Sequence, residues 1–440
     1  MPVQFKPAQT IDAAYHACHP EIPLEAGDSR YVDLSAVRGG QNLAVSIANS
    51  VRWTPAPKFH KQLVTGHRGC GKSTELKQLQ ARLRQEKFFA VYFDVENALD
   101  LGDLHYLDVL VALARAVAEG VQEAKVQIPQ VLLKNLDKWF AERILTKEQQ
   151  RDIEGALEAE FAVKPKIPLL TRMLVALTGQ IRSGSSRKLE IRQTLERELR
   201  VFLERLNELI DAAQIRLQRK GWEGLIVIVD GLEKMHYKLL PEGQTSHSFL
   251  FVEHAEQLKA PHCHIIYTVP ISLLFNVNLG DSFTETDVIP MVKINEEDGI
   301  TPYQDGREAL QEVVRRRVQI ESIFASTAVV TQLIETSGGS VRDLLRLVRY
   351  ACVKSDTVID RRQAESVILR LMREYDYLVK DEDLALLAKI HATRQVSGDE
   401  ASGRLLQHRL VLEYVNDKRW ADLHPAVRFS PRVQKILHPR

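Results

Sequence analysis

The chain has 440 residues, too many for one compact core, and this length indicates two to four domains. Hydrophobic residues make up 45% and charged residues 27%, as in an ordinary globular protein, and a formal net charge of +1 gives no general reason to bind nucleic acid or an anionic membrane. No apolar run approaches the ~18 residues that span a bilayer, and the N-terminus lacks a signal pattern. The four cysteines favour a reducing compartment. We therefore expect a cytoplasmic protein without membrane contact.

Residues 1–58 form an N-terminal segment that leads into a first predicted strand around Leu63-Val64. A complete G-x-x-x-x-G-K-[ST] motif follows, and then leucines at helical spacing, which is the strand–loop–helix context that this motif requires. Its glycines let successive backbone N–H groups point at phosphate oxygens. The pattern predicts a binding site for a nucleoside triphosphate, formed by Gly66, His67, Arg68, Gly69, Cys70, Gly71, Lys72, Ser73 and Thr74.

Two side chains of this loop have specific chemical roles. Lys72 can neutralise the β- and γ-phosphates, and the Ser73 hydroxyl can bind Mg²⁺. A second Mg²⁺ ligand has to come from a neighbouring strand, and residues 225–229 are consecutive apolar residues that predict a strand buried on both faces. Asp230 emerges at the carboxyl end of that strand, where open α/β sheets bind their ligands. We assign Asp230 to Mg²⁺ through a water molecule; the alternative is a helix-capping Asp.

Glu233 is the nearby acid placed to polarise an attacking water; alternatively, it is a surface carboxylate paired with Lys234. These two motifs resemble those of the AAA+/STAND division of P-loop ATPases. In ordinary AAA+ proteins a catalytic Glu follows the metal-binding Asp directly, whereas here Gly231 holds that position and the acid comes three residues after Asp230. That spacing is similar to the STAND and KAP-type ATPases. The resemblance implies Mg²⁺-dependent ATP binding, and the spacing implies slow, switch-like hydrolysis.

Further strands are predicted by apolar runs. Residues 88–95 predict the second core strand, 264–269 the fourth, and 288–292 a fifth, in which Pro290 suits an edge position because proline cannot donate to a strand ladder. The family carries a polar sensor-1 residue near the γ-phosphate at the end of the fourth strand. Thr268 matches that residue; the alternative is an ordinary β-branched strand residue.

The ATPase core is expected to span residues 59–298. Roughly 130 residues separate its second and third strands, far more than a βαβ crossover needs, and we expect a helical insertion at about residues 120–220. A stripe of apolar residues from Ile191 to Leu217, at three- and four-residue steps, predicts a long helix. This helix could form a coiled-coil arm or a partner surface, but packing within the insertion is the favoured interpretation.

Residues 299–370 are predicted to form an all-α lid. The segment 337–345 resembles the sensor-2 segment of the family, in which a Gly-Gly turn starts a helix and an Arg on its first turn reaches the bound phosphates. Arg342 matches that Arg, and its guanidinium over the γ-phosphate would distinguish ATP from ADP. The alternative is an Arg on an amphipathic helix whose leucines face inward.

Residues 371–440 show helical apolar spacing followed by a predicted hairpin, with a first strand at 411–415 and a turn at Asn416-Asp417. This order is the outline of a winged helix, which ATPases of the family often carry after the lid. From Arg404 to Arg440, eight Lys or Arg residues stand against three Asp or Glu residues. The module could therefore contact DNA phosphates; the alternative is a packing module.

The expected fold is therefore α/β, a P-loop NTPase parallel sheet with a helical insertion, an all-α lid and a C-terminal winged-helix-like domain. The resemblance implies an ATP-dependent molecular switch that controls its own assembly into a homo-oligomer, or a partner effector protein, in bacterial signalling or antiviral defence against phage. No effector domain is visible in the sequence, so an effector would be another protein. The alternative is a DNA-binding, initiator- or loader-like AAA+ ATPase that uses the basic C-terminal module.

Overall fold

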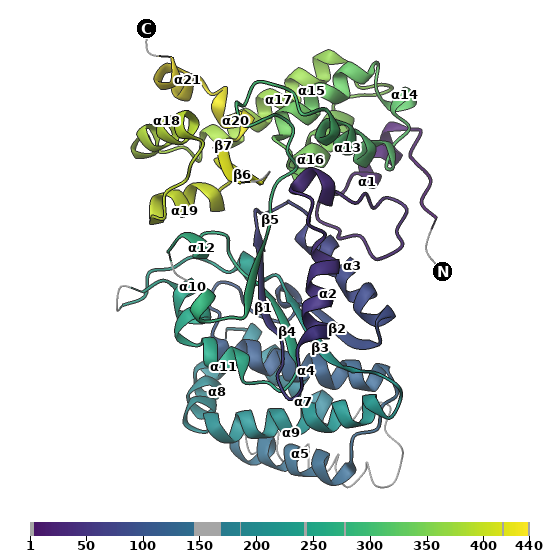
Figure 1. The fold of residues 1–440 in the computed structure, drawn as a ribbon, viewed down its shortest axis with the longest axis vertical. Helices are drawn as coiled ribbons and strands as arrows, with labels where there is room; N and C mark the ends of the chain where they lie inside the picture. Colours follow the sequence, from purple (N-terminus) through teal and green to yellow (C-terminus); the bar gives the residue numbers. More distant parts are fainter. Residues whose placement is uncertain are drawn as a thin grey trace.

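The computed structural model describes residues 4–144, 169–184, 186–241, 244–276, 279–415 and 418–438. At its centre lies a five-stranded sheet with the strand order β2-β3-β4-β1-β5, in which every neighbouring pair is parallel (Figure 1). The carboxyl ends of all five strands therefore lie at one edge of the sheet, where ligands of open α/β sheets bind. The strands are β1 (Lys61–Gly66), β2 (Phe88–Asp94), β3 (Gly224–Asp230), β4 (His264–Thr268) and β5 (Glu285–Ile289).

This parallel sheet confirms the predicted α/β fold, and the runs predicted for the first four strands coincide with β1 to β4. The prediction for the fifth strand is wrong by three residues, because β5 begins at Glu285 and Pro290 follows its last residue. β5 is an edge strand, so it is only partly buried and carries polar side chains such as Thr286 and Asp287. The apolar run that located it overlaps only the last two residues of the strand.

Helices cover both faces of the sheet, which explains why every residue of β3 is buried. On one face lie α2 (Leu43–Trp53) and α3 (Lys72–Gln85). On the other face lie α4 (Tyr106–Glu123), α9 (Leu199–Gln218) and α11 (Ala255–Lys259). The two layers of helices exclude water from the strands and leave the carboxyl edge of the sheet as the place where polar loops gather.

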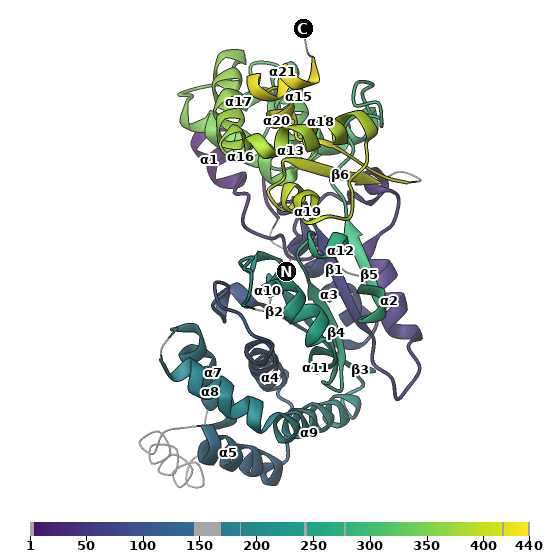
Figure 2. The same cartoon turned by 90° about the vertical axis from the view of Figure 1, so that its left-hand side faces the viewer.

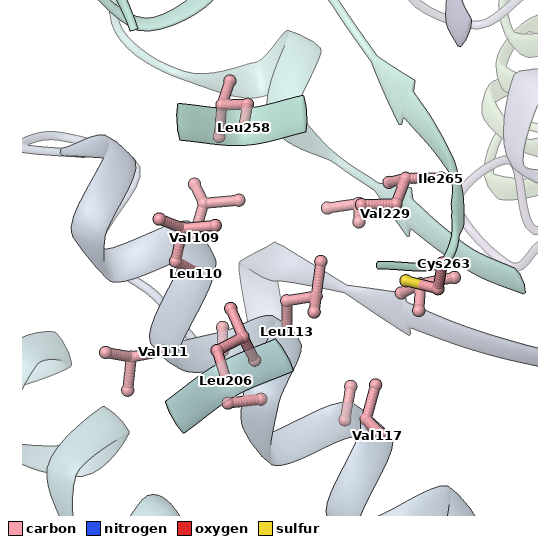
Figure 3. Packing of buried hydrophobic residues seen from close by; sticks show 14 of the residues in the cluster. Val109, Leu110, Val111, Leu113, Val117, Leu206, Val229, Leu258, Cys263 and Ile265 are labelled. Atoms are coloured by element: carbon pink, nitrogen blue, oxygen red, sulfur yellow. The ribbon is translucent and has the colours of Figure 1, made fainter. Parts of the chain in front are cut away.

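Helix α4 is the centre of the larger hydrophobic cluster. Figure 3 shows Leu110 and Leu113 of α4 among side chains of the sheet, such as Val229, and of the neighbouring helices, such as Leu206 and Leu258. Each fully buried leucine side chain stabilises the fold by about 1.5–3 kcal/mol relative to an exposed one. α4 therefore anchors the insertion to the sheet.

The predicted helical insertion forms an outer layer behind α4 (Figure 2), made of α5 (Gln130–Ile144), α7 (Leu169–Arg182) and α8 (Ser186–Arg197). Residues 145–168 of the insertion lie outside the described residues. The prediction of one continuous long helix is wrong, because the backbone at Glu198 (φ −105°, ψ 17°) leaves the helical region between α8 and α9. The apolar stripe of both helices is buried in the main cluster. It packs within the protein and does not project as an arm.

The region predicted as a lid, which we continue to call the lid, contains α13 (Gln304–Arg315), α14 (Ile320–Ile323), α15 (Thr327–Ser337), α16 (Val341–Val353) and α17 (Arg361–Asp376), and α17 continues past the predicted boundary at residue 370. The N-terminal helix α1 (Ile11–Ala17) packs on α16 and shares its hydrophobic cluster. Residues 18–42, which we call the strap, then pass from the lid to the core across α3. In the strap, the Leu24 N–H donates to Thr74 Oγ1 (3.2 Å) and the Tyr31 hydroxyl donates to Glu75 Oε2 (3.2 Å).

The C-terminal module contains α18 (Leu384–Thr393), α19 (Glu400–Gln407), β6 (Val411–Val415), β7 (Arg419–Leu423), α20 (Pro425–Arg428) and α21 (Pro431–Leu437). Strands β6 and β7 form the predicted antiparallel hairpin, in which Val411 lies opposite Leu423. The predicted turn at Asn416-Asp417 lies outside the described residues. The core also contains two short helices, α10 (Ser246–Ser248) and α12 (Leu273–Asn276).

The hairpin is packed against the core instead of projecting into solvent. Leu412, Tyr414 and Trp420 are buried in the cluster that also contains α2, α3 and one face of the sheet. The Met291 N–H, just beyond β5, donates to Glu413 O (3.0 Å). The module therefore sits over the carboxyl edge of the sheet (Figure 1). Across the ranges described, no helix combines the length and apolar character needed to cross a membrane.

A buried carboxylate joins the lid to the C-terminal module. Asp343 of α16 accepts hydrogen bonds from Arg409 Nη1 (2.8 Å), Tyr375 Oη (2.9 Å) and Arg346 Nη1 (2.9 Å). Burial alone would raise the pKa of Asp343, but Arg409, His424 and Arg346 hold it far below its usual range. The carboxylate is therefore ionised and is the main counter-charge of Arg409.

We predict that Asp343→Asn lowers the free energy of unfolding by about 3–5 kcal/mol, because Arg409 is left buried without a counter-charge. Chemical denaturation of the variant and the unaltered protein would measure the change. Asp356→Asn, at an exposed position of the lid, is the control and should leave stability unchanged within about 0.5 kcal/mol. An unaltered stability in Asp343→Asn would show that this ion pair does not hold the two parts together.

Candidate nucleotide-binding site

The loop between β1 and α3 has the backbone shape that phosphate binding requires. Gly66, Gly69 and Gly71 have φ angles of 150°, 89° and 102°, a region that side chains disfavour. A Cβ atom on Gly66 would lie 2.4 Å from Ile289 O, and one on Gly69 would lie 2.5 Å from Arg342 Cβ. The loop therefore passes too close to β5 and to the lid for any side chain at these positions. Helix α3 begins directly after Gly71, so its positive N-terminal end lies at the loop.

Lys72 is buried at the first position of α3. Its Nζ donates to Gly66 O (2.9 Å) and His67 O (3.0 Å), and lies 3.6 Å from Glu233 Oε1. The ammonium is thus held by loop carbonyl groups that a phosphate can replace. The fold also brings Lys72 beside Glu233, the acid predicted to activate water.

Asp230 lies at the carboxyl end of β3 and is almost fully buried. Its Oδ1 accepts from the Gly231 N–H (2.8 Å), its Oδ2 accepts from the Tyr92 hydroxyl (2.6 Å), and its carboxylate also bonds Ser73. Burial, together with the nearby Glu233 carboxylate, raises the pKa of Asp230 to about 6. The structure therefore brings the two predicted metal ligands, Ser73 and Asp230, into contact.

Glu233 lies in a short helical turn, Leu232–Lys234, directly after β3. Burial alone would raise its pKa, but Lys72 and a hydrogen bond from Thr268 hold the pKa below its usual range. Within the described part of the chain, Glu233 Oε2 is buried without a hydrogen-bond partner. An ionised carboxylate with one unoccupied oxygen is suited to accept a proton from water.

The surroundings of Glu233 exclude its predicted alternative, a surface pair with Lys234. That lysine turns away to Asp94 and Glu96, and Glu233 itself is buried. Thr268 of β4 is also buried, and its Oγ1 accepts from the Leu232 N–H (3.1 Å). Thr268 therefore holds the turn that carries Glu233, in addition to bonding its carboxylate.

Gly231 explains the unusual spacing between the two acids. Its φ is 90°, and a Cβ atom there would lie 2.4 Å from Asp94 Oδ1. A glutamate directly after Asp230 is therefore disfavoured by the backbone conformation, and it would require the Asp94 side chain at the end of β2 to move. Glu233, three residues after Asp230, is the acid that the fold places at the loop.

Arg342 lies against the loop from the lid side. Its backbone N–H donates to Gly69 O (3.2 Å). Burial, followed by the neighbouring Arg409 and Arg68, lowers the pKa of its guanidinium. Its Nε is buried and has no hydrogen-bond partner among the residues that the structure describes. The surrounding positive charge makes this corner attractive to an anion, as the sensor-2 assignment requires.

His67 faces away from the loop and into the C-terminal module. Its Nε2 accepts from the Glu413 N–H (2.9 Å), so Nδ1 carries the proton and donates to Leu406 O (3.1 Å). Burial lowers the pKa of His67 to about 3, which keeps the ring neutral. Of the remaining predicted loop residues, Arg68 is exposed, Cys70 is buried, and Thr74 accepts a hydrogen bond from the strap.

Two residues near the loop are not predicted by sequence reasoning. Arg38 of the strap donates to Cys70 O and lies 3.6 Å from Glu75 Oε1, and no motif marks it. Tyr92 of β2 bonds Asp230. A tyrosine near the end of a buried strand only weakly indicates a contact with Asp230, because the sequence alone does not show which strand lies beside β2.

The donor set fits Mg²⁺ bound together with a nucleotide. Among the described residues, no group of three or more His, Cys, Asp or Glu side chains is arranged to hold a metal ion. Mg²⁺ usually binds one or two protein oxygen ligands and completes its octahedron with phosphates and water. Ser73 and Asp230 supply that number, and the raised pKa of Asp230 shows a buried negative charge that a cation would stabilise.

Comparisons with known proteins add little to this site. The chain matches no protein-family model and none of the curated proteins. The solved structures similar to it include the Walker-type ATPase PABY2304 of Pyrococcus abyssi (12% identity, 96% of this chain and 99% of that chain, TM-score 0.40) and Cdc6p of Pyrobaculum aerophilum (10% identity, 96% and 97%, TM-score 0.39). Similarity this distant does not extend to function.

We predict that Lys72→Ala binds Mg²⁺-ATP about ten- to hundredfold more weakly, because a charge-assisted hydrogen bond to phosphate contributes roughly 1.5–3 kcal/mol. Isothermal titration calorimetry would measure the affinity. Lys58→Ala, which removes an exposed ammonium before β1, is the matched control. Equal ATP affinity in Lys72→Ala and the unaltered protein would refute the phosphate-loop assignment.

We predict that Glu233→Gln still binds ATP but hydrolyses it about 10²–10⁴-fold more slowly, because the amide keeps the shape of the side chain and cannot take a proton from water. Phosphate release under single-turnover conditions would measure the rate. The double variant Gly231→Glu/Glu233→Gln should not recover activity, since a Cβ atom at position 231 meets Asp94. Recovery of hydrolysis in the double variant would contradict the role of Gly231.

Proposed function

We propose that the protein binds ATP with Mg²⁺, hydrolyses it slowly, and uses the bound nucleotide to control the position of its lid and C-terminal module. The observation that carries this proposal is that one loop contacts all three parts. Lys72 lies beside Glu233 of the core, Gly69 accepts from Arg342 of the lid, and His67 is bound by the C-terminal module. A phosphate in this loop acts on the contacts of all three parts at once.

Hydrolysis is supported by the partners of Lys72. Its ammonium would leave the loop carbonyl groups for the γ-phosphate, because a charge-assisted hydrogen bond is stronger than a neutral one. Glu233 would then lose its nearest cation, and its carboxylate could accept a proton from the attacking water. When bound to Ser73 and Asp230, Mg²⁺ would neutralise part of the phosphate charge.

The switch is supported by hydrogen bonds that join the loop, the sensor-2 turn, the segment after β5 and the hairpin. The Tyr414 hydroxyl donates to Gly338 O (2.7 Å) in the turn before Arg342. Glu413 donates to His67 Nε2 (2.9 Å) through its N–H and accepts from the Met291 N–H (3.0 Å) through its carbonyl. A change in the shape of the loop would displace His67 and weaken the contact that holds the hairpin against the loop. The winged-helix-like module would act here as a packing element.

The DNA-loading alternative has less support, because most basic side chains in the described part of the module are already paired with acids. The pairs are Arg404 with Asp383, Arg409 with Asp343, Lys418 with Glu297, Arg419 with Glu413, Arg428 with Asp422, and Arg432 with Asp381. Folding therefore neutralises the local excess of basic residues. The partner we propose is an effector protein or a second copy of the chain, with signalling or antiviral defence as the context that the resemblance implies.

We predict that a non-hydrolysable ATP analogue increases hydrogen–deuterium exchange in residues 411–423, because it weakens the contact between the hairpin and His67 of the loop. Arg342→Ala should abolish this nucleotide-dependent difference. It should lower ATP affinity by at most about ten- to hundredfold, since most phosphate contacts come from the loop. Exchange mass spectrometry and size-exclusion chromatography with ATP, ADP or no nucleotide would measure both effects.

Arg373→Ala, at an exposed position of α17, is the matched control and should behave as the unaltered protein does. Identical hairpin exchange and identical elution in all three nucleotide states would refute the switch. In the same samples, ATP-dependent binding of duplex DNA that weakens steeply with salt would favour the DNA-loading alternative.

A further inference from the structure

The carboxylate of Asp230 is held on both of its oxygen atoms. Oδ1 accepts from the Gly231 N–H (2.8 Å), and Oδ2 accepts from the Tyr92 hydroxyl (2.6 Å). One donor belongs to the backbone next to Asp230 and the other to the adjacent strand, since β2 and β3 pair with Tyr92 opposite Ile228. Two fixed donors at opposite ends of a carboxylate set the direction of its remaining lone pairs.

Tyr92 is itself fixed from the opposite side. The Nζ atom of Lys77, one helical turn after Ser73 on α3, lies 3.9 Å from the centre of the Tyr92 ring, a distance that gives a favourable cation–π contact. Lys77 also pairs with Glu25 of the strap (2.9 Å). The hydroxyl of Tyr92 is therefore held towards Asp230 by contacts with the helix that carries Ser73.

We propose that Tyr92 selects the metal ion: its hydrogen bond to Oδ2 of Asp230, together with the Gly231 N–H on Oδ1, fixes the orientation of the carboxylate, disfavours chelation of a cation by both oxygens, and so favours Mg²⁺ over Ca²⁺ in the nucleotide complex. Ca²⁺ takes six to eight oxygen ligands and readily accepts bidentate carboxylates, whereas Mg²⁺ requires an octahedron, keeps several waters and binds few carboxylate oxygens. Tyr92 is a positioning residue, because it acts through Asp230. The inference rests on the proposed binding of Mg²⁺-ATP, with Asp230 bound to the cation directly and not through the water molecule expected from the sequence.

Removal of the Tyr92 hydroxyl frees Oδ2 and allows the carboxylate to rotate. Tyr92→Phe is then expected to lower the ratio of Mg²⁺- to Ca²⁺-supported nucleotide affinity by about tenfold, the lower end of the effect of a hydrogen bond to a charged group. Affinity measured in EDTA should stay within about twofold, because the phosphate loop is unchanged. A fluorescent, non-hydrolysable ATP analogue, titrated with Mg²⁺, with Ca²⁺ and with EDTA, gives all three affinities without turnover.

Tyr106→Phe is the matched control. Its hydroxyl donates to Glu196 Oε2 (2.7 Å), the same kind of bond, in the helical insertion, and it should leave the metal ratio unchanged. Tyr92→Met, a second variant without the hydroxyl, is titrated in the same way, so that the result does not depend on how one replacement packs. Thermal melts establish that each variant is folded.

The outcomes separate this inference from the proposed function. If the unaltered protein binds the analogue with Mg²⁺, and both Tyr92 variants keep its Mg²⁺/Ca²⁺ ratio, the metal-selecting role is wrong and nucleotide binding stands. A uniform loss of affinity with Mg²⁺, Ca²⁺ and EDTA would assign Tyr92 a purely structural role and also overturn the inference. If the unaltered protein binds no nucleotide under any of these conditions, the proposed function itself is wrong.

Discussion

Buried negative charge at the carboxyl edge of the sheet is the constraint on which the site depends. Asp230 and Glu233 are both buried, and one ammonium, that of Lys72, lies beside Glu233. Burial, and after it the neighbouring Glu233 carboxylate, disfavours the ionised state of Asp230, and the raised pKa of Asp230 is the result. Parallel strands are what make the arrangement possible, because β1 and β3 end at the same edge and β4 lies between them with Thr268. A cation bound at this edge would offset the buried negative charge.

Glycines make the contacts between the parts of the molecule unusually close. A Cβ atom on Gly339 would lie 1.8 Å from Val292 O, and one on Gly338 would lie 2.7 Å from Leu412 Cδ1. The turn before Arg342 thus packs closely against both the segment that follows β5 and the hairpin. Such closely packed interfaces tend to have a few discrete arrangements instead of deforming continuously. A small displacement of the loop is therefore well suited to become a displacement of the hairpin.

Helix α16 links the candidate nucleotide site to the C-terminal module through two adjacent residues. The backbone of Arg342 is bonded to Gly69 of the loop, while the buried carboxylate of Asp343 binds Arg409 of the module. The two contacts do not compete, because Arg342 uses its backbone N–H and Asp343 uses its side chain. The same ion pairs that dock the module also neutralise its basic residues, which is why its composition is a poor guide to whether it binds DNA.

The sequence by itself determined the local features: the loop from Gly66 to Ser73, the buried strand before Asp230, and the hairpin strands of the C-terminal module. Each is set by short-range effects, namely the steric freedom of glycine, the burial of a continuous apolar run, and the alternation of apolar and polar side chains along a paired strand. Local patterns were insufficient where exposure or a single dihedral mattered, as in the polar edge strand β5 and in the break at Glu198.

Only the tertiary structure decided which distant residues complete the site. Tyr92 reaches Asp230 because β2 pairs with β3, Arg38 reaches Cys70 because the strap crosses α3, and His67 points into a module more than three hundred residues later in the chain. These contacts depend on how separate segments pack and on which buried charges and hydrogen-bonding groups must find partners. That pairing is a property of the whole folded chain, and no short stretch of the sequence carries it.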